Sequence, residues 1–256
     1  KIFTHHWILW RIYNLFKFSC IIKHITNNMK QLKRVFYFII TASVLFGCKK
    51  SELKKPTEVV FMVDINKEAT MNGNLFFTDG EIVIRSLAFD GVRIKGDDVY
   101  FEKEFEGGLV APFSSVSENN LLKFDIPQGS YTSIRIDFES EQSDFQKIKI
   151  NGSYKNSSNE IVPITVEVDR IEFYDKIAKN AQGTTTIDLV AGSPSKAIIQ
   201  LNPVFWFSTV ASTQLDNADV TVINGVATIL INSTVNSDLY DLLDDKVGSN
   251  IDLTFQ

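Results

Sequence analysis

From residue 59 onward, apolar and polar side chains alternate with a period of two along many short segments. The alternation is clearest at residues 134–139 (IRIDFE) and 164–169 (ITVEVD). Alternation with one charged face is typical of antiparallel strands that pack on the core with one face and are exposed to solvent on the other. The same pattern predicts further strands at residues 59–65, 81–89, 99–105, 147–150, 187–189, 197–201, 219–223 and 226–231.

Glycine-containing dipeptides between apolar runs predict tight turns. Asn224-Gly225 is the strongest hairpin signal, because both residues tolerate positive φ. Asp90-Gly91 and Asn151-Gly152 offer the same chemistry, and residues 126–131 (IPQGSY) predict a proline-initiated turn. Many short strands joined by frequent turns predict an all-β fold, an antiparallel β-sandwich built as one elongated or two small sandwiches.

Helical periodicity is confined to the C-terminal part of the chain. In residues 237–248 (SDLYDLLDDKVG), leucines and Val247 form an apolar stripe. Ser237 is suited to cap this segment and Gly248 to end it. The sequence therefore predicts one short helix near 238–247, with a shorter helical turn after Pro203.

Charge is distributed unevenly along the chain. Residues 1–47 contain seven Lys and Arg residues and no acid, whereas residues 48–256 contain 19 basic and 31 acidic residues, a formal charge of −12. An acidic body disfavours nucleic-acid binding, because phosphate contacts need clustered cations. Such asymmetry indicates a targeting segment at the N-terminal side.

The targeting segment has a basic start, an apolar run and a cysteine. Met29 opens the basic stretch MKQLKR, and residues 35–46 (VFYFIITASVLF) form a twelve-residue apolar run. This length suits a signal-peptide core and falls short of the roughly 20 residues that span a bilayer. The run ends in Leu45-Phe46-Gly47-Cys48.

Residues 29–48 resemble the signal peptide and lipobox of bacterial lipoproteins, whose pattern has a smaller residue where Phe46 stands. The resemblance implies cleavage between Gly47 and Cys48, a lipid on Cys48, and a mature protein in the cell envelope. The outer membrane facing the periplasm is the expected location, with surface exposure left open. The alternative is a buried helix or plain membrane anchor with an incidental Cys48.

These features divide the chain into segments. Residues 1–28 begin without Met and show no clean apolar period, so we expect upstream translation ahead of Met29, or alternatively a first membrane segment. The predicted remainder is a signal peptide at 29–47, a charged tether at 48–58, and a β-sandwich ectodomain at 59–256. A subdomain boundary is predicted near 175–184, where the alternation lapses.

The predicted mature chain lacks most of the side chains that commonly carry out catalysis. The three histidines, His5, His6 and His24, precede Met29, as does Cys20, so Cys48 is the only cysteine that remains. Residues 48–256 therefore cannot form a Ser-His-Asp or Cys-His apparatus, nor a zinc site with His or Cys ligands. We expect a non-enzymatic protein with no cofactor.

Carboxylates are the remaining candidates for chemistry. Glu102, Glu104 and Glu106 lie on one face of a predicted strand, where a solvated face is the simpler interpretation, because glycosidase chemistry needs two carboxylates across a cleft. Asp97-Asp98 and Asp244-Asp245 offer oxygen ligands for calcium but lack the spacing of an EF-hand loop. We therefore predict no metal site.

Trp206 in NPVFWF is the only tryptophan after Cys48. An exposed indole would make it a candidate glycan contact through ring stacking, whereas the simpler interpretation places it in the core.

Three functions remain open from the sequence. The favoured one is an envelope lipoprotein whose β-sandwich is structural or binds a partner protein or glycan. The alternatives are a carbohydrate-active enzyme that uses an Asp/Glu pair, and a substrate-capture lipoprotein of an outer-membrane uptake system.

Overall fold

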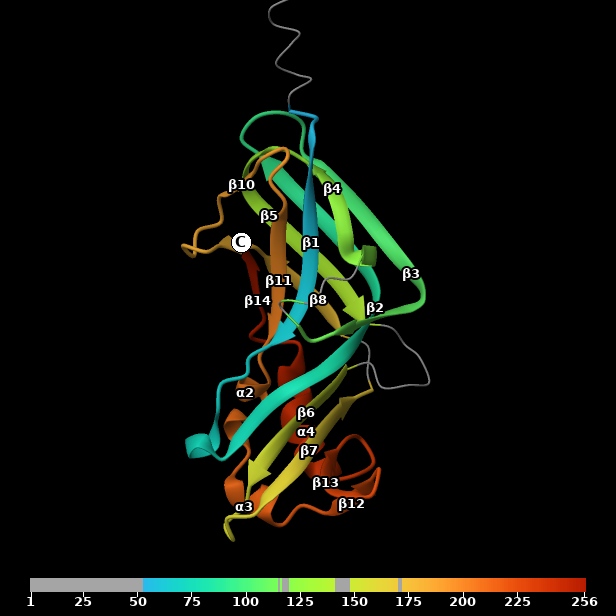
Figure 1. The fold of residues 1–256 in the computed structure, drawn as a ribbon, viewed down its shortest axis with the longest axis vertical. Helices are drawn as coiled ribbons and strands as arrows, with labels where there is room; N and C mark the ends of the chain where they lie inside the picture. The colour runs from blue at the N-terminus through green and yellow to red at the C-terminus, as the bar shows by residue number, and fades with distance from the viewer. Residues whose placement is uncertain (1–52, 115, 117–119, 141–147, 170–171) are drawn as a thin grey trace, which may run out of the picture. The chain divides into compact units, whose positions relative to one another are not determined.

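A computed structural model describes residues 53–114, 116, 120–140, 148–169 and 172–256 (Figure 1). The chain divides into Lys1–Glu52 and Leu53–Gln256. The first part, with the predicted leader and the Gly47-Cys48 junction, lies outside the described residues. No helix within the described ranges is long and apolar enough to cross a membrane.

The described chain has the predicted all-β fold, and its strands form two sheets. Sheet A has the strand order β4-β1-β11-β14-β9. Its strands are β1 (Pro56–Ile65), β4 (Lys123–Pro127), β9 (Lys179–Asn180), β11 (Ser195–Leu201) and β14 (Asp252–Phe255). β1 begins at Pro56, inside the predicted tether at 48–58. The strand therefore starts three residues before the predicted one, which began at Val59.

Sheet B follows the order β10-β5-β2-β6-β7-β13-β12, with β3 paired to β2 and β8 paired to β5. Its strands are β2 (Leu75–Arg93), β3 (Val99–Pro112), β5 (Gly129–Ser140), β6 (Ile148–Lys155), β7 (Ile161–Val168), β8 (Phe173–Ile177), β10 (Ile187–Leu189), β12 (Val220–Ile223) and β13 (Val226–Ile231). Between β8 and β9 the chain passes from sheet B to sheet A, within the region of the predicted boundary at 175–184.

The 19-residue strand β2 runs through both parts of sheet B. Its first part pairs with β6 and its second part pairs with β5, with register shifts between Phe77 and Asp79 and between Ile84 and Ser86. Figure 1 shows β2 passing from the region where the two sheets face each other to the region of β6, β7 and β13. Sheet B therefore has two parts: one around β5 that faces sheet A, and one around β6, β7 and β13.

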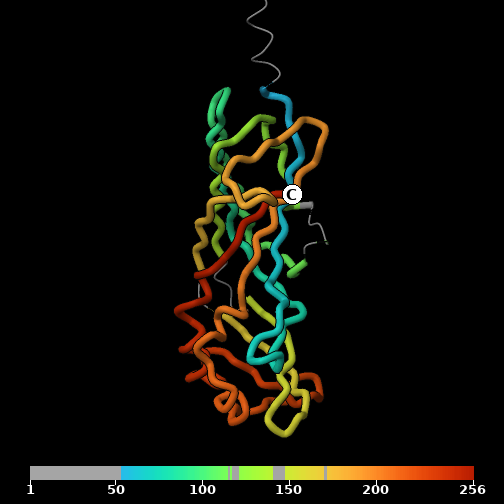
Figure 2. Tube along the Cα trace, turned by 90° about the vertical axis from the view of Figure 1, so that its left-hand side faces the viewer, coloured from blue at the N-terminus to red at the C-terminus, as the bar shows by residue number. Residues whose placement is uncertain are grey.

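Short helical segments accompany the part of sheet B that contains β6, β7 and β13 (Figure 1, Figure 2). They are α2 (Pro203–Trp206), η3 (Phe207–Thr209), α3 (Ser212–Asp216) and α4 (Ser237–Val247); two further turns are η1 (Met71–Gly73) and η2 (Asn120–Leu122). The helix predicted near 238–247 is confirmed, but its ends differ from the prediction. Asn236, with φ 50°, precedes the helix in place of a Ser237 cap, and Gly248 keeps a right-handed conformation.

Aromatic rings connect the two sheets through the core. Phe61 on β1 lies 5.7 Å from Phe124 on β4, measured between ring centroids, and Phe124 lies 4.9 Å from Phe101 on β3. Phe101 stacks on Phe89 of β2 at 5.3 Å, and Phe89 meets Tyr131 of β5 edge-on at 6.1 Å. Such contacts add to the free energy of burial and hold sheet A against sheet B.

Among the described strands, all pairings but three are antiparallel. β1 pairs with β11, β13 with β7, and β14 with β9 in parallel register. The prediction of an antiparallel sandwich misses these pairs, because each joins segments that are distant in the sequence, and period-two alternation carries no information about strand direction.

Two of the predicted turns form and two do not. Asn224 (φ 51°) and Gly225 (φ 83°) connect β12 to β13 as predicted, and Gln128 links β4 to β5. The prediction of turns at Asp90-Gly91 and Asn151-Gly152 is wrong, because both pairs lie inside strands, β2 and β6.

These two glycines are needed for close packing instead. A Cβ on Gly91 would lie 2.6 Å from the Tyr131 ring and 2.7 Å from the Phe89 ring. A Cβ on Gly152 would collide with the backbone carbonyl oxygen of Phe76 on the neighbouring strand. Glycine in a strand often marks such a close approach.

We predict that Gly152→Ala lowers the free energy of unfolding by about 3 kcal/mol, because a backbone oxygen cannot move aside as a flexible side chain does. Urea unfolding followed by far-UV circular dichroism measures the change. Gly183→Ala is the matched control: its φ is +81° and nothing lies within 4 Å, so only the left-handed conformation costs, about 1 kcal/mol. Equal losses in the two variants would contradict the packing argument.

Candidate functional site

Glu102, Glu104 and Glu106 are all exposed on β3. Glu102 accepts a hydrogen bond from the hydroxyl of Tyr100 at 3.2 Å. Glu104 and Glu106 line a hollow of about 460 Å³ together with Arg85. The three carboxylates thus come from one strand face and do not oppose each other from two walls.

The two acidic pairs occupy a loop and a helix. Asp97 and Asp98 follow β2, where the carbonyl of Asp97 and the carboxylate of Asp98 accept hydrogen bonds from Arg93. Asp244-Asp245 lies in the last turns of α4. Among the described residues, no group of three or more Asp, Glu, His or Cys side chains is arranged to hold a metal ion.

Trp206 ends α2 and is fully buried, with 0% of its surface exposed. No face of the indole is therefore available for stacking on a sugar in this structure, and the core interpretation describes its position. Asn202 caps α2, because its side-chain oxygen accepts a hydrogen bond from the amide of Phe205 at 3.1 Å. Phe207, the next residue, packs on Phe77 of β2 at 5.3 Å.

A carboxyl pair that the sequence analysis missed lies on the outer face of sheet B. Asp137 of β5 stands directly opposite Asp175 of β8. Burial raises the pKa of Asp137, and the neighbouring Asp175 carboxylate raises it further, while Arg135 acts in the opposite direction. Arg135 Nη1 lies 2.6 Å from Asp175 Oδ2. No local signal marks this pair, because β5 and β8 are separated by more than 30 residues of sequence.

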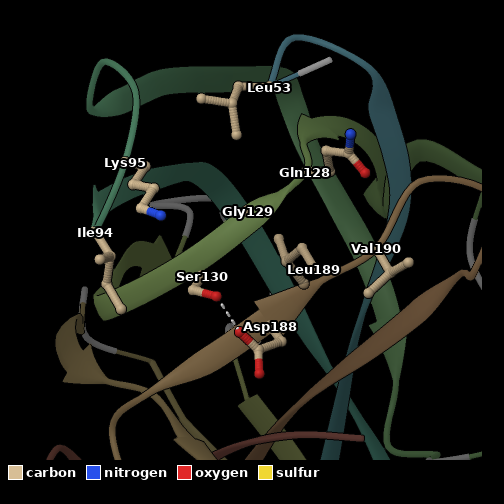
Figure 3. Close-up of a pocket in the computed structure, with 9 residues that line it drawn as sticks. All are labelled: Leu53, Ile94, Lys95, Gln128, Gly129, Ser130, Asp188, Leu189 and Val190. Carbon is tan, nitrogen blue, oxygen red and sulfur yellow. Dashed lines mark hydrogen bonds between the residues drawn. The ribbon is translucent and has the colours of Figure 1, made fainter. Parts of the chain in front are cut away.

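A cleft of about 580 Å³ opens at the end of the described unit where Leu53 lies (Figure 3). We call this end, formed by residues 53–57, 93–98, 127–130 and 187–195, the tether end. Ile94 and Lys95 stand on one side of the cleft, and Leu189 and Val190 on the other. The cleft is thus built from four segments that are distant in sequence.

The polar groups of the cleft come from neighbouring strands. Ser130 of β5 and Asp188 of β10 are register partners, and the Ser130 hydroxyl donates a hydrogen bond to the Asp188 carboxylate (Figure 3). The side chain of Gln128 accepts a hydrogen bond from the amide of Ala191 at 3.1 Å. These bonds fix both strands and the following loop beside the apolar side chains of the cleft.

Arg93 holds the tether end together. Its guanidinium donates to the carbonyl oxygens of Leu53 at 2.7 Å, Gln128 at 3.2 Å and Asp97 at 2.7 Å. Charge-assisted bonds of this kind are among the stronger hydrogen bonds in proteins. One cation therefore joins the first described residue, the β4–β5 connection and the β2–β3 loop. Sequence reasoning could not find it, because all three acceptors are backbone atoms.

Tyr131 is a buried residue that contacts the tether end from the core. Its hydroxyl donates to the carbonyl of Pro127 at 2.6 Å. Burial raises the pKa of Tyr131 to about 12, and the positive charge of Arg93 works against that rise. Tyr131 thus stays a neutral donor at physiological pH.

The edge of sheet B at β12 is a second candidate site (Figure 1). Among the described residues, β12 pairs with β13 alone, so its other edge has no neighbouring strand. Val220 and Val222 are 59% and 72% exposed, and no charged residue lies within β12. Natural proteins often protect such an edge with charges, proline or a bulge; the four residues of β12 include no charge and no proline, which suits this edge to pairing with another strand.

Comparison with protein-family models, curated proteins and solved structures finds no match to this chain. The arguments for function therefore depend on the sequence and on the geometry of these surfaces.

We predict that Asp137→Asn stabilises the fold at pH 7, because it removes a carboxylate whose charged form is disfavoured in the folded state. The folded-state pKa lies above the ordinary value of 3.8, so wild type loses stability as the pH rises from that value through the folded pKa. The advantage of the variant should therefore shrink as the pH falls toward 3.8. Urea unfolding between pH 3 and pH 8 measures it.

Asp252→Asn is the matched control, since it removes an exposed carboxylate on β14 of sheet A and not on this face. A gain for Asp137→Asn that does not change with pH, or that the control reproduces, would contradict the pairing argument.

Proposed function

We propose that this chain is a lipid-anchored protein of the bacterial cell envelope whose β-sandwich body binds a partner protein and catalyses no reaction. The expected location is the outer membrane, facing the periplasm. Support for the anchor comes from the basic start, the twelve-residue apolar run and the Gly47-Cys48 junction, in the order that lipoprotein leaders have. The compact β unit begins at Leu53, five residues after Cys48.

The exposed edge of β12 is the observation that carries the binding part of the proposal. Strand addition at such an edge gains main-chain hydrogen bonds, and side chains at alternate positions provide selectivity. Val220 and Val222 lie two positions apart and so point to the same face, where they offer apolar contacts to an incoming strand. The partner expected from this chemistry is an extended protein segment with apolar side chains at alternate positions.

A protein partner is favoured over a glycan in part because the tryptophan that the sequence offered for stacking is buried. Stacking on a sugar needs an exposed ring, and Trp206, the last residue of α2, has 0% of its surface exposed. Three polar side chains of the tether-end cleft are already engaged, in the Ser130–Asp188 pair and in the bond from the amide of Ala191 to Gln128. The β12 edge has free main-chain pairing capacity on one side, which suits a polypeptide.

The carbohydrate-active enzyme is not favoured by the carboxyl pair of sheet B. Glycosidase carboxylates flank the scissile bond at separations of roughly 5–9.5 Å. Asp137 and Asp175 are instead register partners on neighbouring strands, so they project from one face of sheet B and do not stand on two walls of a cleft. Their arrangement explains a perturbed pKa without a catalytic role.

The anchor is tested by expressing the chain from Met29 in a bacterium fed a labelled fatty acid. We expect label on the wild-type protein and none on Cys48→Ala, because the thiol is the site of attachment. The control Cys48→Ala protein should also leave the membrane fraction. Label retained by Cys48→Ala would overturn the lipobox assignment.

The partner is tested by placing a photo-crosslinking amino acid at Val222 in the living cell. We expect a discrete heavier adduct, and we expect Val220→Lys to abolish it, since a charge on the same face opposes apolar pairing. The matched control carries the crosslinker at Ile161 of β7, an exposed apolar residue on a strand that lies between β6 and β13 in the same sheet. Equal adducts from both positions, or an adduct that survives Val220→Lys, would contradict recognition at this edge.

A further inference from the structure

The tether end exposes apolar side chains that the core does not use. Ile94 and Val190 are each 56% exposed and line the same cleft from different loops (Figure 3). The amide of Ile94 donates to the carbonyl of Ser130 at 2.8 Å, which fixes the backbone beneath this side chain. The two residues therefore form a held apolar rim on loops whose other side chains are mostly polar.

The length of the tether limits how far this rim can lie from a lipid on Cys48. Leu53 lines the cleft and stands five positions after Cys48. A fully extended chain covers at most about 3.6 Å per residue, so Leu53 lies within about 18 Å of the lipidated residue. With Cys48 at the bilayer surface, the part of the body that Arg93 ties to Leu53 stays close to the headgroups.

Charge at the tether end is opposite in sign to the charge of the body. The tether end contains four cations and three acids: Lys54, Lys55, Arg93 and Lys95 against Asp97, Asp98 and Asp188. The chain just before it adds Lys49 and Lys50 against Glu52, so the formal charge of the two together is +2. The whole chain from Cys48 onward carries −12. Anionic headgroups attract lysines near the membrane surface and repel an acidic body, so the field orients this end toward the bilayer.

We propose that the tether end rests on the membrane, with Ile94 and Val190 inserted among the headgroups of an anionic bilayer. The inference rests on the proposed lipid anchor, and it adds an orientation. The loops of the cleft face the lipid, and the β12 edge, which Figures 1 and 2 place at the other end of the described unit, faces away from it. Side chains in this role enter the boundary between headgroups and acyl chains.

The test uses the chain from Cys48 onward, coupled through the Cys48 thiol to a maleimide phospholipid in vesicles of phosphatidylethanolamine and phosphatidylglycerol. This coupling makes the result independent of lipidation in the cell, which the fatty-acid experiment tests separately. Trp206 is buried and is the only native tryptophan of this chain, so an introduced tryptophan reports its own position. The variants are Ile94→Trp, Val190→Trp and, as the matched control, Val222→Trp.

Quenching by lipids with a nitroxide on the headgroup is then measured for each variant. We expect the fluorescence of Ile94→Trp and Val190→Trp to fall at least threefold more than that of Val222→Trp. Replacing phosphatidylglycerol by phosphatidylcholine should reduce this difference, because the lysines lose their anionic partners. Equal quenching of the three variants, or stronger quenching of Val222→Trp, would overturn the orientation while leaving the lipid anchor intact.

Discussion

The structure depends on the apolar core between its two sheets, and the aromatic contact between Phe101 of β3 and Phe124 of β4 joins the sheets at the margin of that core. The rings are 4.9 Å apart and belong to a continuous series that includes Phe61, Phe89 and Tyr131. These side chains bury large apolar surfaces and, with few rotamers, lose little entropy on packing. The tether end is built on this series, since Tyr131 bonds Pro127 and Arg93 lies four residues after Phe89.

The two ends of the described unit differ in chemistry. The tether end is basic, closed by hydrogen bonds from Arg93, and bears an apolar rim. The end with β12 has an unpaired strand edge with exposed valines. Under the proposed lipid anchor, this arrangement would present the β12 edge away from the membrane.

Much of the fold could be predicted because strand periodicity is local. Segments 187–189 and 226–231 match β10 and β13 to the residue, and the helix near 238–247 forms as expected. The failures have a common cause. Asn151-Gly152 has turn chemistry, but the pair lies inside β6. Glycine is needed there because Phe76 of the neighbouring strand approaches too closely for any side chain. A dipeptide cannot reveal what will lie beside it.

The candidate sites could be predicted less well than the fold. Trp206 was a candidate because it is the only tryptophan after Cys48, but it is fully buried at the end of α2. Arg93 had no motif, and its importance arises from three carbonyl groups that are brought together by folding. The Asp137–Asp175 pair likewise exists only because β8 aligns with β5.

By itself, the sequence determined the all-β class, the hairpin at Asn224-Gly225, the C-terminal helix, the charge split and the lack of His and Cys ligands after Cys48, because each is a property of composition or of neighbouring residues. Only the tertiary structure decided the three parallel pairings, the cleft at the tether end and the free edge of β12. Alternation specifies which face of a strand is buried. It does not specify which strand lies alongside, since that choice depends on packing between segments far apart in the chain.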